Sequence, residues 1–382
     1  MTMRIGFNTF QLHRRITGAG RFAKNLLRAL AELDDENEYV IFLRKDNANY
    51  YSLEKPNFKN VITGVSRKIR VKRILAEQFK LPKLAKEHNI DIFWSPSDIA
   101  PRNLHCPSIA TIHDLKRFVL PQEFPFLERT YYKWFVRQTA QNSNLIFTVS
   151  ESSGRDIMKH LDIPAERIVV AHNGVDPDIL AEEEGLPLES LKRIHGIPDE
   201  YILFVGQMIK SKNVPRMIRA FVKCKAANNH HFVLVGQSGA GMHEIEQTIR
   251  REHTSENKLR ERIHHVKWAP AEQLVSFYKN ASALFFASLY EGFGFPLVEA
   301  MACGAPIITS DRSSMPEVAG DAAILVNPND EEAMTQALNK ILTDDWLRSH
   351  LILKGKIRVN FFSWENTARK YMAVWERLKK SL

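Results

Sequence analysis

The chain has 382 residues, 44% of them hydrophobic and 25% charged, which is the composition of a soluble globular protein too long for one ordinary core, so we expect two domains. No apolar run approaches the roughly 18 residues of a membrane-spanning helix, and the N-terminus lacks the apolar segment of a signal peptide. The net charge of +9 favours an acidic partner, and nucleic acid is the weakest candidate because no nucleic-acid-binding motif is present.

Apolar runs of strand length alternate with amphipathic helical stretches along the first half of the chain. Strands separated by helices form parallel βαβ units, with helices on both faces of a sheet. The expected strands cover residues 3–8, 39–43, 61–65, 91–94, 108–112, 144–149 and 167–171. The expected helices cover residues 20–33, 74–88, 125–141 and 152–161.

Residues 176–198 are polar and rich in turn formers, which is typical of an interdomain connection. The alternation then restarts, so we expect a second doubly wound domain with ligands at the carboxyl ends of its strands. Its expected strands cover residues 201–205, 232–235, 263–267, 284–287, 307–309 and 323–326. The expected helices cover residues 214–224, 242–252, 273–280, 330–342, 346–361 and 364–378, the last with Ser363 as its N-cap.

One stretch predicts a strand, a glycine loop and a helix in immediate succession. The apolar run 283–287 precedes Glu291-Gly-Phe-Gly294, and Gly304 ends the helix that follows. This arrangement directs free backbone N–H groups and the positive end of a helix toward an anion. Glu291 and Glu299 add two carboxylates beside it. Phosphate held by N–H groups and hydroxyls held by carboxylates suit a nucleotide-sugar.

The motif resembles the E-x7-E signature of retaining GT-B glycosyltransferases of the GT4 type, also called glycosyltransferase group 1. Three segments carry the resemblance in the second half: Glu291-Gly-Phe-Gly-Phe-Pro, Glu299-Ala-Met-Ala-Cys-Gly and Ser314-Met-Pro-Glu-Val-Ala-Gly-Asp-Ala-Ala323. Further matching segments are His113-Asp-Leu, Thr148-Val-Ser-Glu-Ser, Ile168-Val-Val-Ala-His-Asn-Gly-Val-Asp176 and Val205-Gly-Gln207 with Lys212-Asn213.

The resemblance implies an α/β fold of GT-B architecture, in which two doubly wound, Rossmann-like domains face each other across a cleft. An acceptor-binding domain would comprise residues 1–184, and the C-terminal helix 364–382 would cross back to it. A nucleotide-sugar-binding domain would comprise residues 185–363.

The resemblance also implies roles for individual residues. Lys212 would neutralise the departing diphosphate. Glu291 would position the donor sugar and stabilise positive charge at its anomeric carbon, and Glu299 would accept hydrogen bonds from the ribose. His113 would hydrogen-bond to the donor sugar. The expected catalytic residues are His113, Glu291 and Lys212, and the expected donor-binding residues are Gly18, Gly20, Gln207, Lys212, Glu291, Gly292, Phe293, Gly294 and Glu299.

The chain departs from the family pattern in its cations. Many relatives have an arginine at the position of Gln207, and others have one at the position of Ser211. Either another basic residue substitutes, with Arg216 as a candidate, or backbone N–H groups hold most of the diphosphate.

Two shorter motifs need separate interpretation. Gly18-Ala-Gly20 opens a formal dinucleotide fingerprint, but residues 9–17 separate it from the first strand, so a loop closing on donor and acceptor fits better. Asp176-Pro-Asp178 has the D-x-D pattern with which other glycosyltransferases hold a metal ion. It begins the interdomain connection, so we interpret it as a turn and expect no metal requirement.

Residues 67–73 contain five basic residues, and two interpretations stay open: a solvated loop, or a landing patch for anionic lipid. The aromatic segment 121–132 could contribute to such a patch or could simply pack. The five residues are Arg67, Lys68, Arg70, Lys72 and Arg73.

We therefore predict a metal-independent retaining hexosyltransferase with no cofactor. Its donor would be a nucleoside-diphosphate sugar, with GDP-mannose as the first choice by analogy, and its acceptor a saccharide or lipid-linked saccharide in polysaccharide or lipopolysaccharide biosynthesis. The alternatives are another GT-B enzyme, such as an epimerase or phosphorylase, and a non-catalytic nucleotide-sugar-binding protein. Three widely spaced cysteines favour the cytoplasm, with peripheral attachment to the inner face of the plasma membrane as an added option.

Overall fold

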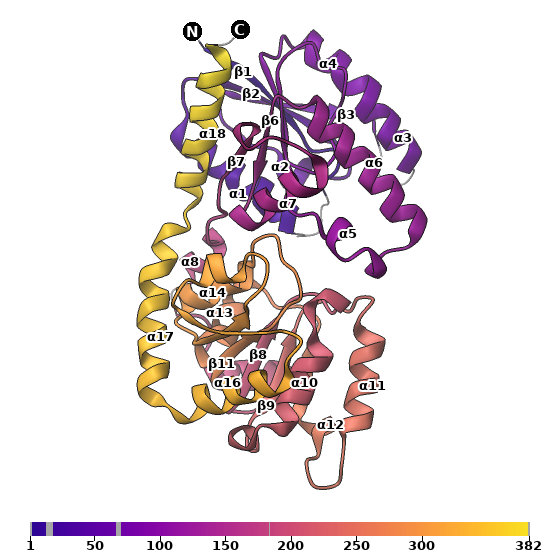
Figure 1. The fold of residues 1–382 in the computed structure, drawn as a ribbon. Coiled ribbons are helices and arrows are strands. Elements are labelled where there is room, and N and C mark those ends of the chain that lie inside the picture. The colour runs from indigo at the N-terminus through magenta and orange to yellow at the C-terminus, as the bar shows by residue number, and fades with distance from the viewer. Residues whose placement is uncertain (1, 13–17, 66–69, 183, 381–382) are drawn as a thin grey trace. The chain divides into compact units, whose positions relative to one another are not determined.

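The computed structural model describes residues 2–12, 18–65, 70–182 and 184–380. The chain divides into two compact units, each an α/β layer structure (Figure 1). Unit 1 consists of Met1–Gly174 and Ser363–Leu382, and unit 2 consists of Val175–Phe362.

The first boundary between the units follows Gly174, whereas the sequence places it at residue 184. The residues after Gly174 belong to unit 2 because helix α8 (Pro177–Ala181) packs on α13 (Ala271–Asn280). The polar composition of this connection indicated a link, but only the packing of α8 assigns its first part to unit 2.

Within the described residues, unit 1 has a seven-stranded parallel sheet in the order β3-β2-β1-β4-β5-β6-β7. Its central strands are buried on both faces, which explains their nearly continuous apolar composition. The strands are β1 (Arg4–Asn8), β2 (Glu38–Arg44), β3 (Phe58–Thr63), β4 (Ile92–Ser95), β5 (Ser108–Thr111), β6 (Leu145–Thr148) and β7 (Ile168–Val170).

Helices cover both faces of this sheet (Figure 1). They are α1 (Gly18–Leu33), α2 (Ala48–Tyr51), α3 (Arg70–Leu75), α4 (Leu81–Glu87), α5 (Lys116–Val119), α6 (Phe126–Asn142), α7 (Glu151–Leu161) and α18 (Trp364–Lys379). The predicted helices 20–33, 125–141 and 152–161 are confirmed, whereas α2 and α5 were not predicted. Both are single turns, too short to show helical periodicity.

A π-helical turn (Ala76–Lys80) joins α3 to α4, where the sequence predicts one continuous helix over residues 74–88. Pro82 lies in the first turn of α4. A proline lacks the backbone N–H and its ring crowds the preceding turn, so a regular α-helix does not run through it. The π turn carries Glu77, whose side chain is fully buried against the end of β1.

The C-terminal helix α18 returns to unit 1 and packs on α1, as predicted. The Ser363 hydroxyl accepts the Asn366 N–H at 3.1 Å, which confirms the predicted N-cap. Farther along, the hydroxyl of Tyr371 lies 2.8 Å from the Thr111 hydroxyl, and its ring stacks on Phe147. A buried aromatic residue with a satisfied hydroxyl therefore anchors the helix.

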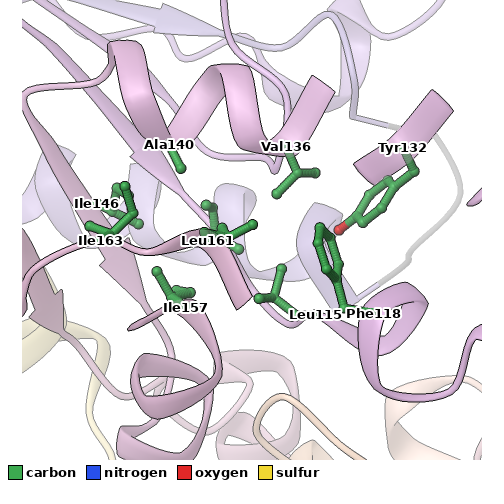
Figure 2. Close-up of a cluster of buried hydrophobic side chains, with 10 residues drawn as sticks. Leu115, Phe118, Tyr132, Val136, Ala140, Ile146, Ile157, Leu161 and Ile163 are labelled. Atoms are coloured by element: carbon green, nitrogen blue, oxygen red, sulfur yellow. The ribbon is translucent and has the colours of Figure 1, made fainter. Parts of the chain in front are cut away.

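A hydrophobic cluster underlies α6 and α7 (Figure 2). Phe118 of α5 and Tyr132 of α6 meet at one end of it, with ring centroids 6.4 Å apart. The cluster members are Ile112, Leu115, Phe118, Tyr132, Val136, Ala140, Ile146, Ile157, Leu161 and Ile163. The cluster fixes the face of α6 that carries Tyr132.

Of the residues that the structure describes, those of unit 2 form a six-stranded parallel sheet in the order β10-β9-β8-β11-β12-β13. This order reverses between β8 and β11, the point at which doubly wound sheets bind ligands. The strands are β8 (Tyr201–Val205), β9 (His231–Val235), β10 (Ile263–Val266), β11 (Ala283–Phe286), β12 (Ile307–Ser310) and β13 (Ala323–Val326).

The remaining helices of unit 2 follow the predicted alternation, with the short helices α9, α12 and α15 added. They are α9 (Leu188–His195), α10 (Val214–Lys223), α11 (Met242–Glu252), α12 (Leu259–Arg262), α14 (Phe295–Cys303), α15 (Met315–Ala319), α16 (Glu331–Thr343) and α17 (Asp345–Arg358). In the part of the chain that the structure describes, no helix has both the length and the apolar composition needed to cross a bilayer.

Candidate active site

The loop of residues 287–294 lies between the buried strand β11 and helix α14 in unit 2, which confirms the predicted strand, glycine loop and helix. Gly294 has φ +98° and precedes the helix, a conformation that side-chain-bearing residues rarely adopt. Gly304, with φ +75°, ends the helix as predicted. The first N–H groups of α14 therefore follow directly on the loop that carries Glu291.

Lys212 reaches the same end of the sheet from β8. It closes a 3₁₀ turn (Lys210–Lys212), after which Asn213 adopts a left-handed conformation with φ +61° and begins α10. The buried Asn213 side chain donates to the carbonyls of Ala287 at 3.1 Å and Pro328 at 2.7 Å. These bonds fix the turn against the loop that follows β11 and the segment that follows β13.

The side chains of Lys212 and Glu291 form an ion pair. Lys212 Nζ lies 2.5 Å from Glu291 Oε1, and the two side chains are only 12% and 11% exposed. The ammonium group also lies 4.8 Å from the centre of the Phe286 ring. Removing either charge would leave the other nearly buried without its partner, which is costly. The pair spans 79 positions in sequence, and sequence reasoning did not predict it.

Two serines after β12 hold the backbone of the Glu291 loop. The Ser314 hydroxyl donates to the carbonyls of Glu291 at 3.0 Å and Phe293 at 2.9 Å. The Ser313 hydroxyl also donates to the Glu291 carbonyl, and Ser313 has φ +55°. A non-glycine residue in this region is strained and typical of a functional loop. Sequence reasoning included Ser314 only in the family match and missed Ser313.

Glu299 lies on α14 and is almost fully buried, with 1% of its surface exposed. The Tyr278 hydroxyl donates to Glu299 Oε2 at 2.7 Å. Burial and the nearby Glu299 charge raise the pKa of the Cys303 thiol to about 12. Glu299 is thus oriented by protein contacts, and the loop residues Gly292, Phe293 and Gly294 are buried beside it.

The two positions at which relatives carry arginine, Gln207 and Ser211, differ from each other in their exposure to solvent. Gln207 is exposed just after β8, whereas the Ser211 side chain is fully buried. Arg216 Nη1 donates to Asn213 Oδ1 at 2.9 Å. Arg216 therefore lies in the first turn of α10, next to the turn that contains Lys212, while Lys210 is exposed within that turn.

His113 lies in unit 1, two residues after β5. Its ring Nε2 is 3.1 Å from the Pro96 carbonyl, and because a carbonyl only accepts, this bond places the proton on Nε2. The ring packs edge-on against Phe22, with centroids 4.8 Å apart. The His113 N–H donates to Asp98 Oδ1 at 3.1 Å. The Asp114 carboxylate accepts the Lys116 N–H at 2.9 Å.

The glycines at the start of α1 are helical, which corrects the predicted glycine loop. Gly18 and Gly20 both lie in the first turn of α1, whereas the sequence predicts a helix beginning at Gly20. The residues immediately before Gly18 lie outside the described part of the chain.

The structure tests the interpretation of Asp176-Pro-Asp178 and describes only part of the basic segment 67–73. The Asp176 carboxylate accepts the Asp178 N–H at 3.1 Å and caps α8, so the segment that the sequence predicts as a turn is the start of a short helix. Of the basic segment, Arg67 and Lys68 lie outside the described residues, and nothing is described of the side chains of Arg70 and Lys72. Arg73 lines a pocket in unit 1.

Asp98 was missed by sequence reasoning. It follows β4 in the run Ser95-Pro-Ser-Asp98, and its Oδ2 accepts the Tyr132 hydroxyl at 2.8 Å. Burial raises the pKa of the Asp98 carboxyl, while the His113 charge and the Tyr132 hydrogen bond lower it, and the net shift is upward. Its place after the carboxyl end of a parallel strand was the signal that could have identified it.

Comparison with known proteins defines the class. The family model described as Glycosyltransferase Family 4 matches residues 16–179, and the one described as Glycosyl transferases group 1 matches residues 189–358. O-antigen chain mannosyltransferase B of Escherichia coli is 26% identical over 391 residues, which cover 98% of this chain and 100% of the relative.

Solved structures share the fold. Sucrose-phosphate synthase of Thermosynechococcus elongatus superposes with a TM-score of 0.77 at 18% identity, and 100% of each chain is covered. HepE of Anabaena in complex with UDP-glucose superposes with a TM-score of 0.75 at 16% identity, covering 99% of this chain and 100% of HepE. The two doubly wound units therefore define a glycosyltransferase of the GT-B fold class. The chain belongs to the group 1 glycosyltransferases of the GT4 type.

Proposed function

We propose that the chain is a retaining hexosyltransferase that uses a nucleoside-diphosphate sugar and requires no metal. The sugar would pass to a saccharide or lipid-linked saccharide in the assembly of a polysaccharide or lipopolysaccharide. The observation that carries the proposal is the Lys212–Glu291 pair beside the N-terminus of α14. It combines a cation for a leaving diphosphate with a carboxylate for a sugar that develops positive charge.

The proposed reaction is a front-face displacement. The bond between the anomeric carbon and the diphosphate oxygen breaks, and the acceptor hydroxyl forms a bond on the same face of the sugar. The acceptor proton passes to the leaving diphosphate. Lys212 would hold the diphosphate with its remaining N–H groups, Glu291 would stabilise the sugar, and His113 would hydrogen-bond to it.

Glu299 would bind the ribose hydroxyls of the donor, with its carboxylate oriented by Tyr278. Gln207 and the loop glycines would line the nucleotide site, and Gly18 and Gly20 would contribute to donor binding from the first turn of α1. Lys210, in the turn that contains Lys212, and Arg216, at the start of α10, are the basic residues that could replace the arginine of relatives.

The donor base and sugar follow from the similar proteins by analogy only. The name of the Escherichia coli relative favours mannose, which agrees with GDP-mannose as our first choice. HepE forms a complex with UDP-glucose, so a uridine nucleotide is the alternative.

The first experiment is thermal unfolding of the full chain with a panel of nucleoside diphosphates and nucleotide-sugars, with and without EDTA. A ligand that binds only the folded state raises the unfolding temperature by mass action. We expect a rise for one base, unchanged by EDTA and lost in Glu299→Ala. The absence of any rise would contradict the proposed donor site, and a rise that needs a divalent metal would contradict metal independence.

A non-catalytic nucleotide-sugar-binding protein is the second candidate. Ser211 and Gln207 occupy the positions at which relatives carry a cation. The missing positive charge favours a protein that binds the nucleotide-sugar without catalysis. Turnover decides between the two, because a binding protein would show the thermal shift without releasing nucleoside diphosphate when an acceptor is present.

We also propose that the protein acts in the cytoplasm and that unit 1 binds the anionic inner face of a membrane. Leu75 and Phe79 are one helical turn apart and 50% and 69% exposed, directly after the basic segment 67–73. On α6, Phe126 and Leu127 are 65% and 81% exposed. Exposed apolar side chains combined with basic residues are typical of a surface that lies on anionic lipid.

A further inference from the structure

Helix α17 lies along one side of unit 2 (Figure 1) and carries a row of exposed apolar side chains. Trp346, Leu353 and Ile357 are 72%, 59% and 59% exposed. Phe361, in the 3₁₀ turn that follows the helix, is 65% exposed. His350 completes the row, and its ring stacks on the Trp346 ring with centroids 5.0 Å apart. Successive members are four, three, four and four positions apart, so they share one helix face, which we name the α17 stripe.

The opposite face of α17 packs on unit 2 and determines which way the stripe points. Leu351 and Gly355 are the buried residues of the helix. A Cβ atom at Gly355 would lie 3.3 Å from Met301 Cγ, so glycine lets α17 approach α14 closely. Rotating the helix to bury the stripe would break this packing. The stripe therefore stays in solvent unless another molecule covers it.

The size of the α17 stripe fits one half of a protein interface. An aromatic side chain carries roughly 150–250 Å² of surface, so the exposed parts of its four apolar members amount to roughly 500 Å². A contiguous apolar patch of this size is often an interaction surface. Contact between two such stripes would bury on the order of 1,000 Å², and flanking residues would bring this into the roughly 1,200–2,000 Å² of stable interfaces.

The charges at the two ends of α17 favour a second copy of the same helix. Asp344 caps the first turn and Asp345 lies within it, so this end is acidic although Arg348 pairs with Asp345. Lys356 and Arg358 make the last turn basic. In an antiparallel pair, the acidic end of each helix lies beside the basic end of the other, and the helix dipoles are opposed favourably. Anionic lipid would instead repel the two carboxylates.

We propose that two copies of the chain associate through α17, related by a two-fold axis that passes close to Leu353. A two-fold axis perpendicular to the helix makes the contact self-complementary, because the same patch serves on both copies. Counted from this axis, Trp346 of one copy faces Phe361 of the other, and His350 faces Ile357. The stripe lies outside the loop 287–294, so the proposal does not depend on the proposed reaction.

The first test is analytical ultracentrifugation of the full chain at increasing concentration. We expect the mass to rise from 43.9 kDa to twice that value. Leu353→Glu would bring two carboxylates together at the axis, so the Kd of the dimer should rise at least about a hundredfold. Leu180→Glu, at a leucine that is 56% exposed on α8 of the same unit, is the matched control and should dimerise as the unaltered protein does. Ile357→Glu is a second variant in case Leu353→Glu does not fold.

Disulfide cross-linking tests the orientation of the two helices. In an antiparallel pair, only residues near the axis lie close to the same residue of the other copy. Leu353→Cys should therefore form a disulfide between copies under mild oxidation, and Trp346→Cys should not. The unaltered chain is the control for its own three cysteines. A disulfide in Trp346→Cys above this control would overturn the antiparallel arrangement, and its absence in Leu353→Cys would overturn the position of the axis.

Two further outcomes would overturn the proposal as a whole. The first is a mass of 43.9 kDa at every concentration, or equal dimerisation of the unaltered chain, Leu353→Glu and Ile357→Glu. The second concerns lipid and uses vesicles containing phosphatidylglycerol, with the chain diluted to the range in which it is monomeric. Vesicle binding should then be the same in Leu353→Glu and the unaltered chain, and weaker binding of the variant would assign the α17 stripe to lipid.

Discussion

The loop 287–294 of unit 2 and the pocket of unit 1 are built in opposite ways. The loop is a contiguous segment that follows one strand and begins one helix, and a single ion pair, Lys212–Glu291, adds the distant partner. The pocket draws its wall from α1, α3, α5, α6 and the segments that follow β1 and β4. A site made of one segment leaves a readable motif, whereas a site made of many segments does not.

The two sites also differ in charge. Unit 2 places a cation and a carboxylate in contact, both nearly buried, which suits a ligand that carries charge and redistributes it during reaction. The described wall of the pocket contains two arginines and two carboxylates, of which Arg117 and Glu128 form an ion pair. We therefore expect substitutions in the loop to change the reaction rate.

The largest expected effect is a fall in kcat when Glu291 of the loop 287–294 is substituted. Glu291→Gln keeps the shape of the side chain and removes its charge, so we expect kcat to fall by about 10²–10³-fold, the usual cost of losing one preorganised electrostatic group. The measurement is release of nucleoside diphosphate at saturating donor and acceptor. Glu332→Gln, exposed on α16 of the same unit, is the control. An unchanged kcat in Glu291→Gln would remove Glu291 from the chemistry.

The second expected effect is a pH dependence of stability in unit 1. Burial raises the pKa of Glu77 from 4.5 to about 7, although Asn8 and Gln11 donate to its carboxylate. Between these values the unfolded chain loses the proton more readily than the folded one, so stability falls as pH rises. The loss is on the order of 3 kcal/mol by pH 8.

Glu77→Gln should remove this loss. The glutamine carbonyl can still accept from Asn8, and its amide can donate to a rotated Gln11 side chain, which lines the pocket. We would measure the free energy of unfolding in urea at pH 5 and pH 8. The exposed Glu54→Gln is the control. An equal pH dependence in Glu77→Gln and the unaltered protein would contradict the prediction.

The third effect concerns the membrane-binding surface, which we assign to unit 1 alone. Phe79→Ser and Leu127→Ser together should weaken binding to vesicles containing phosphatidylglycerol by about tenfold, because each loses apolar area that lipid would cover. Co-sedimentation at low and moderate salt measures this. Trp346→Ser removes an equally exposed aromatic residue from unit 2 and should have no effect. An equal loss in all variants, or no binding of the unaltered protein, would refute the assignment.

The smallest effect tests how Glu299 is held. Tyr278→Phe removes the hydroxyl that donates to Glu299 Oε2, so we expect nucleotide affinity to fall several-fold, about 1 kcal/mol, with kcat at saturation unchanged. Tyr201→Phe is the control, because this buried hydroxyl donates instead to the Phe277 carbonyl. It should lower stability without changing nucleotide affinity, and equal affinities in both variants would contradict the role of Tyr278.

Much of the fold was predictable because it depends on local patterns. The alternation of apolar strands with amphipathic helices predicted both parallel sheets, and the cap at Ser363 followed from its side chain. Gly294 and Gly304 marked the beginning and end of α14 because both have positive φ. The π turn before Pro82 and the boundary after Gly174 were not predicted.

By itself, then, the sequence determined two doubly wound domains and the motif around Glu291, since both depend on residues close together in the chain. The tertiary structure alone decided which distant side chains meet. The strand order brings the ends of β8 and β11 together, and with them Lys212 and Glu291. It likewise assembled Asp98 and Tyr132 from separate elements. Periodicity records which face of an element is buried, but it does not record which element packs against that face.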